Sequence, residues 1–110
     1  MPYDEDLAAR VRRELASRSD VTERKMFGGI AFMVAGNMCC GVTGEDLMLR
    51  LGAEGADAAL DDLHTRPMDF TGRPMAGFVY VASEGTATAP DLRRWVDRAL
   101  DFAATLPPKG

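Results

Sequence analysis

Apolar side chains recur at two different periods along this chain, and the change of period separates helices from strands. Residues 4–18 place an apolar side chain every three or four positions and fill the other face with arginines, which is typical of an amphipathic helix. A second, shorter helix is predicted over residues 53–63, and a third begins near Pro90. The second stripe consists of Ala56, Ala59, Leu60 and Leu63. The third and strongest consists of Leu92, Trp95, Val96, Ala99, Leu100 and Ala103.

The remaining segments follow the two-residue period of strands. Residues 24–35 read as one long strand in which both alternating sets are apolar, so we expect it to be covered on both faces or to lie at an oligomer interface. The turn residues Gly36 and Asn37 predict a hairpin after it, because both tolerate a positive φ. Shorter strands are predicted at 38–42, 47–51, 68–70 and 76–82.

The predicted element order is α-β-β-β-α-β-β-α. Helices at both ends and in the middle of hairpin-connected strands favour a two-layer α+β domain with a mainly antiparallel sheet. With 110 residues the chain is long enough for one small domain, and we expect that domain to span residues 1–110 with its core at about 4–106.

Composition and charge exclude several classes of function. A formal net charge of −4 argues against direct nucleic-acid binding, although Arg93, Arg94 and Arg98 form a local basic cluster that keeps this alternative open. No apolar run is long enough to span a membrane. The N-terminus is acidic and lacks a signal-peptide pattern, and the chain has two cysteines, so we expect the reducing environment of the cytoplasm.

The residues that could carry chemistry form no recognisable catalytic, cofactor or metal site. Cys39 and Cys40 are adjacent on a predicted strand, where side chains alternate between faces, so we expect them not to bind one metal together. We interpret at least one of them as a small core residue, with a redox switch as the alternative. His64 is the sole histidine, and we read it as a helix-terminal residue. We therefore assign no catalytic residue and expect no cofactor, and we favour a non-enzymatic role with an unrecognised enzyme as the alternative.

Glycine and methionine mark the most informative stretch. The pair Gly28 and Gly29 interrupts an apolar run without a phosphate-loop pattern, which predicts a bulge or bend. Methionine is flexible and polarizable, so the methionines near the strands either fill core gaps or form an adaptable protein-binding face. Those methionines are Met26, Met33, Met38, Met48, Met68 and Met75.

Several of these segments together resemble a known family. They are Lys25-Met26-Phe27-Gly28-Gly29, Phe32, Gly36-Asn37-Met38, Met48-Leu49-Arg50, Pro67-Met68-Asp69-Phe70, Gly72-Arg73-Pro74-Met75 and Gly77-Phe78-Val79-Tyr80-Val81. Over about residues 4–106 the chain resembles the N-terminal domain of the TfoX/Sxy proteins. The resemblance implies a fold like that of type III secretion chaperones and a relation to bacterial regulators of natural competence. It assigns no catalytic residue. The competence regulators carry a second, C-terminal domain, for which this sequence has no counterpart, so we expect a stand-alone domain.

Two hypotheses of function follow. The first is a non-enzymatic protein-interaction module in transcriptional regulation, which also forms a homodimer through residues 30–34. Its candidate surface consists of Met26, Phe27, Gly28, Gly29, Phe32, Gly36, Asn37 and Met38. The alternative is a small anionic-ligand-binding domain, or an unrecognised enzyme, with a site at the glycine pair. There Arg50, Arg66 or Arg73 would fix the anion, and a concave pocket lined by these arginines would distinguish the two hypotheses.

Overall fold

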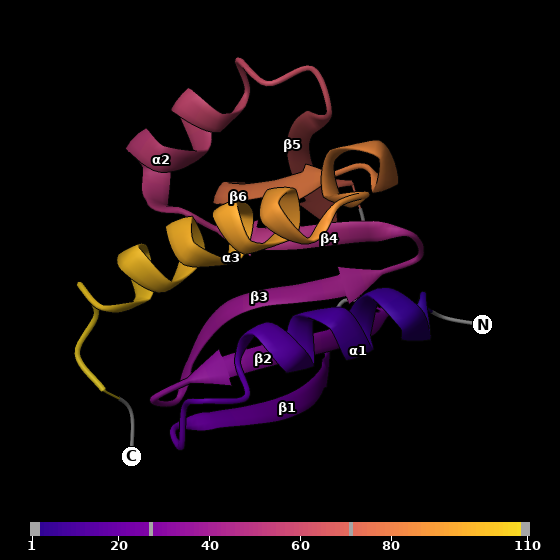
Figure 1. Cartoon of the computed structure of the whole chain (residues 1–110). Helices are drawn as coiled ribbons and strands as arrows, with labels where there is room; N and C mark the ends of the chain where they lie inside the picture. The colour runs from indigo at the N-terminus through magenta and orange to yellow at the C-terminus, as the bar shows by residue number, and fades with distance from the viewer. Residues whose placement is uncertain (1–2, 27, 71, 109–110) are drawn as a thin grey trace.

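Three α-helices pack against a six-stranded sheet in the part of the chain that the computed structural model describes, residues 3–26, 28–70 and 72–108 (Figure 1). The helices are α1 (Glu5–Glu14), α2 (Gly52–Ala59) and α3 (Ala89–Ala103), and a 3-10 turn, η1 (Ser83–Thr86), precedes α3. The strands are β1 (Val21–Met26), β2 (Gly29–Val34), β3 (Asn37–Thr43), β4 (Asp46–Arg50), β5 (Thr65–Phe70) and β6 (Arg73–Val81). Neighbours pair antiparallel in the order β1-β2-β3-β4-β6-β5, which confirms the α+β class.

Local side chains define where the outer helices begin. The Asp4 carboxylate accepts hydrogen bonds from the backbone N–H groups of Asp6, at 2.9 Å, and Leu7, at 3.1 Å, and so caps α1. The Thr88 hydroxyl caps α3 in the same way through the N–H of Asp91. The helix predicted over 4–18 ends at Glu14, because the following residues form turns.

The main core lies between the helices and the sheet. Figure 1 shows α1 and α3 crossing this face of the sheet, and Arg93 of α3 is paired with Glu14 at the end of α1. Trp95 projects from α3 into the core, where only 1% of its surface is exposed, and its indole N–H donates to the Gly85 carbonyl at 3.2 Å. The predicted stripe of α3 is therefore the face that packs on the sheet, although Leu100 is only partly buried.

The strand predicted over residues 24–35 is wrong as a single element, because the chain reverses within it. Gly28 adopts a φ of +73° in the turn between β1 and β2, and the first meander has four strands instead of three. The predicted bend at the glycine pair is thus a hairpin turn. Gly29 begins β2 so close to β3 that a Cβ atom there would overlap the carbonyl oxygen of Val42.

The outer strands of the sheet and the end of α2 also differ from what the pattern of apolar residues predicts. The outer strand β1 is exposed over residues 22–25, which are polar or charged. At the opposite border, β5 contains Pro67. Helix α2 ends at Ala59, so Leu63 lies beyond it with 89% of its surface exposed and does not extend the predicted stripe into the core. None of the helices in the described ranges is long and apolar enough to cross a membrane.

Replacing Glu23 with glutamine is expected to lower the free energy of unfolding by less than about 1 kcal/mol at neutral pH, because the pair it forms with Arg12 is partly exposed. Two hydrogen bonds, at 2.7 and 2.8 Å, join Arg12 of α1 to this carboxylate of β1. They lower the pKa of Glu23 against the opposing effect of burial.

Because the folded pKa is the lower one, the pair stabilises the domain above the ordinary glutamate pKa of about 4.3 and loses this effect as the pH falls through the folded value. Urea unfolding of the wild type and Glu23→Gln should therefore differ at neutral pH, and the difference should shrink as the pH is lowered toward about 3. A difference that stays equal at both pH values would contradict this assignment.

Candidate interaction surface

The face of the sheet opposite α1 and α3 carries a second apolar cluster built mainly from methionine. We call it the methionine face: Ala31, Met33, Met38, Met48 and Met68 are buried in it, and Met26, Met75, Phe78 and Tyr80 are partly buried around it. Cross-strand pairing explains how it forms. Met33 lies opposite Met38, and Met48 lies between Gly41 and Tyr80. A Cβ atom at Gly41 would come within 2.7 Å of the Met48 methyl group, so the Met48 side chain lies over this glycine.

An apolar groove of about 390 Å³ continues from the methionine face to α2. One wall consists of Ala53, Ala56, Asp57 and Leu60, and the other of Pro67, Met68 and residues 74–79. Leu60 is 38% exposed at the rim of this groove. Because Met68, Met75 and Phe78 belong both to the groove and to the methionine face, the groove and this mostly buried face form one continuous apolar region.

Two arginines are held by aromatic rings beside this surface. The Arg66 guanidinium lies 4.6 Å from the centre of the Tyr80 ring and is paired with Asp46. The Arg50 guanidinium lies 5.8 Å from the ring centres of both Phe78 and Phe102. These cation–π contacts are favourable and fix the positions of the two guanidinium groups beside the apolar surface.

The residues predicted as an interaction surface are divided among four places. Met26 and Met38 lie on the methionine face, whereas the Phe32 side chain is buried in the main core, with Arg12 5.9 Å from its ring centre. Gly28 and Gly29 form the β1–β2 turn and the start of β2. Phe27, which belongs to the same prediction, lies outside the described residues.

The remaining two members of the prediction lie at the β2–β3 turn. Gly36 has a φ of +82°, as the hairpin prediction requires. Asn37 is 6% exposed, and its side-chain amide donates to the Pro107 carbonyl at 2.8 Å, which attaches the segment after α3 to the sheet. This amide therefore has a clear structural role.

The arginines proposed for an anion site lie on three neighbouring strands, β4, β5 and β6, away from the glycine pair. Arg50 and Arg66 make the aromatic contacts described above, and Arg73 is exposed at the start of β6. Gly28 and Gly29 lie at the opposite border, between β1 and β2. The sequence-based ligand hypothesis thus combined residues that the strand order separates.

The two cysteines do not follow the predicted alternation. In the pairing of β2 with β3, Phe32 lies opposite Cys40 and Met33 lies opposite Met38, so Cys39 is the additional residue of a β-bulge. The bulge shifts the alternation by one position, and both cysteines belong to the main core, fully buried. The prediction that their side chains point to opposite faces is therefore wrong.

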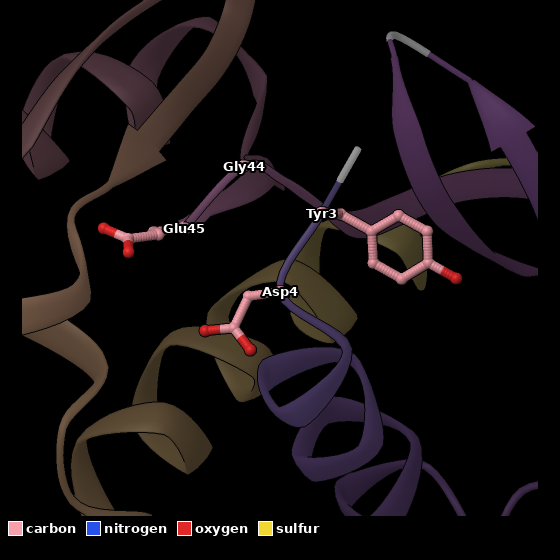
Figure 2. A pocket seen from close by; sticks show the side chains of 4 residues that line it. All are labelled: Tyr3, Asp4, Gly44 and Glu45. Carbon is pink, nitrogen blue, oxygen red and sulfur yellow. The ribbon is translucent and has the colours of Figure 1, made fainter. Parts of the chain in front are cut away.

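A smaller hollow of about 270 Å³ lies where the N-terminal segment meets the β3–β4 turn (Figure 2). Its lining includes the carboxylates of Asp4 and Glu45, and Figure 2 shows the Tyr3 ring directed away from them. The Asp4 carboxylate is already engaged as the cap of α1. Across the described part of the chain, no group of three or more His, Cys, Asp or Glu residues is placed to hold a metal ion.

The α2 wall of the groove is the part of the site that sequence reasoning missed. The apolar stripe of this helix signalled burial, and Ala56 and Ala59 are buried as expected. The stripe does not indicate how closely the neighbouring β5–β6 hairpin approaches α2. The two elements leave a groove between them, and Leu60 is exposed at its rim.

Comparison with known proteins places the fold in a family. A family model described as the TfoX N-terminal domain matches residues 13–103 of the 110-residue chain. The matched segment includes every strand of the sheet, both walls of the groove and all of α3. No curated protein matches the chain. The family match covers most of the sequence and agrees with the motifs recognised in it, and the chain therefore belongs to the TfoX N-terminal domain family.

Proposed function

We propose that this domain is a non-enzymatic protein-interaction and regulatory module, and that a partner protein binds the groove between α2 and the β5–β6 hairpin. The observation that carries the proposal is Leu60, a large apolar side chain exposed at the rim of an apolar groove. Leu63 adds a second exposed leucine a few residues further along the chain. Contiguous exposed apolar surface is typical of protein-binding sites in water-soluble folds.

The chemistry of the groove suits an amphipathic partner segment. Met68 and Met75 supply flexible thioether side chains, which adapt to partners of different shape. Pro67 and Pro74 lie on the same wall and restrict its backbone. Asp57 adds one carboxylate, which favours a basic residue beside the apolar anchors of the partner. The continuation onto the methionine face would bring Met26 and Met38 of the sequence-based surface into the same binding area.

Family membership supports a regulatory role for this interaction. The resemblance to the TfoX/Sxy proteins implies a relation to bacterial competence regulators, and we propose a protein component of cytoplasmic transcriptional regulation as the partner. A second copy of this chain is the main competing occupant of the groove, in which case the domain would be a homodimer.

Changing Leu60 to glutamate is expected to weaken partner binding at least tenfold, because the carboxylate would lose its hydration in an apolar contact. Ala58→Glu provides a matched control, because it adds the same charge two residues away. Ala58 is exposed near the end of α2 and does not line the groove. Tagged wild type and both variants, each verified as folded by circular dichroism, would be used for capture from bacterial lysate with mass spectrometry.

Proteins captured by the wild type and Ala58→Glu but lost with Leu60→Glu would support the proposal, with affinities then measured on the purified pair. Equal capture by all three proteins would contradict it. Light scattering on the same samples tests the homodimer: a dimer disrupted by Leu60→Glu alone would identify a second copy as the occupant. A small molecule that accompanies the wild type in native mass spectrometry would instead favour the ligand hypothesis.

A further inference from the structure

The β-bulge in β3 creates a pair of neighbouring thiols that an ordinary strand would keep apart. Both cysteines are free, and both are buried on the helix side of the sheet. The bulge brings these two adjacent side chains into the same core cluster, and a hydrogen bond between the two thiol groups affects the pKa of both. This pairing is independent of the groove and of the function proposed for it.

The two thiols differ in how readily they lose a proton. The hydrogen bond from Cys40 lowers the pKa of Cys39, and the positive charge of Arg18 acts in the same direction, against burial and the charge of Asp20. The same hydrogen bond and burial raise the pKa of Cys40. Cys39 is therefore the more readily deprotonated of the two thiols.

A single inserted atom suits this pair better than a direct disulfide bond. The Cα atoms of adjacent residues lie about 3.8 Å apart across a trans peptide, whereas disulfides usually span about 4.4–6.8 Å. A direct bond between Cys39 and Cys40 would therefore strain the peptide that joins them. An atom bonded to both sulfurs lengthens the bridge and removes this conflict.

We propose that Cys39 and Cys40 form a dithiol site for a soft, thiophilic centre of the trivalent arsenic class. Arsenous acid, As(OH)₃, would condense with the pair: two As–S bonds form and two As–O bonds break. Each thiol proton leaves with one hydroxyl as water, and one hydroxyl remains on arsenic. Neither sulfur nor arsenic changes oxidation state, so the reaction needs no oxidant or reductant. Soft sulfur ligands such as these select soft centres over hard cations.

The loop between α1 and β1 provides the route to this site. Residues 16–20 of the loop are exposed, and Arg18 and Asp20 act on the Cys39 thiol from it. The loop is held by the Arg18–Asp20 ion pair and by the hydrogen bond from the Ala35 N–H to the Asp20 carbonyl, each at 2.9 Å. Two longer hydrogen bonds join the N–H groups of Ala16 and Arg18 to the carbonyls of Arg13 and Leu15. Local opening of so few contacts would admit a small, uncharged molecule such as arsenous acid.

The test is thermal unfolding of the intact domain with and without sodium arsenite, together with native mass spectrometry. Because the bulge preorganises the two sulfurs, arsenite should bind the folded chain more tightly than the unfolded one. We expect one arsenic per wild-type chain and a Tm that rises by roughly 10 °C at an arsenite concentration about 100-fold above its Kd. Cys39→Ser and Cys40→Ser should lose both the bound arsenic and the rise in Tm.

Alanine replaces serine in these variants where a buried hydroxyl prevents folding, as judged by circular dichroism. A fall in Tm with arsenite, or arsenic bound only in urea, would overturn the proposal, because adjacent cysteines in an unfolded chain also react. If one of the single variants bound arsenic as tightly as the wild type, only one thiol would be needed and the dithiol site would be wrong. Oxidation of the pair by diamide that raises the Tm as much as arsenite would show a redox pair instead.

Discussion

Replacing Trp95 with alanine is expected to lower the free energy of unfolding by about 3–5 kcal/mol. This is a large loss, because the total free energy of unfolding of a domain is typically about 5–15 kcal/mol. The ring is buried between α3 and the sheet, with 1% of its surface exposed, and is the largest fully buried side chain in the described part of the molecule. Its loss removes apolar contact and leaves a cavity. The hydrogen bond to the Gly85 carbonyl disappears as well.

Trp95→Phe separates these two contributions. Phenylalanine fills much of the cavity but lacks the indole N–H, so the carbonyl of Gly85 loses its donor at a cost of about 1–3 kcal/mol. Urea unfolding followed by circular dichroism is the suitable measurement, because Trp95 is the sole tryptophan and its replacement removes the fluorescence signal. A loss below about 1 kcal/mol for Trp95→Ala would be incompatible with this packing.

Replacing Gly29 with alanine is expected to cost about 3 kcal/mol or more, because the new methyl group has no space. Its Cβ atom would overlap the carbonyl oxygen of Val42 and lie 2.9 Å from the Cα atom of Thr43. Both are backbone atoms of the neighbouring strand, so no side-chain rotation relieves the clash. Strands β2 and β3 would have to separate at this end, with loss of their hydrogen bonds.

Gly28→Ala is the matched control for this prediction. Gly28 has a φ of +73°, but a Cβ atom added there would meet nothing within 4 Å, so alanine faces conformational strain alone, about 1–2 kcal/mol. Urea unfolding should therefore rank Gly29→Ala as clearly more destabilising than Gly28→Ala. Equal losses of stability would show that the glycine pair is needed for the turn conformation and not for the close approach of β3.

The helices and most strands could be predicted because their apolar residues repeat at the period of the element. Strand β1 could not, since it lies at the edge of the sheet and Glu23, Arg24 and Lys25 give it no apolar alternation. The pattern of apolar residues therefore merged the end of β1 with β2 into one strand. Glycine was correctly recognised as an interruption, but composition does not distinguish a bend within a strand from a reversal between two.

The candidate sites depend on tertiary relations that a sequence pattern does not contain. The methionines were recognised as a group, and the structure gathers them on one face because the strands bring them into register. The groove also requires the position of α2 relative to the β5–β6 hairpin. The shared face of Cys39 and Cys40 arises from one additional residue in β3, which leaves the local sequence looking like an ordinary strand.

The two outer strands determine how this sheet meets other chains. On β1, Arg24 and Lys25 are exposed, and on β5, Pro67 lacks the N–H group that an added strand would need. Both borders are therefore poor templates for edge-to-edge growth, the route by which open sheets join into fibrils. A partner that adds a strand to either border would meet this same protection, which directs binding to the groove instead.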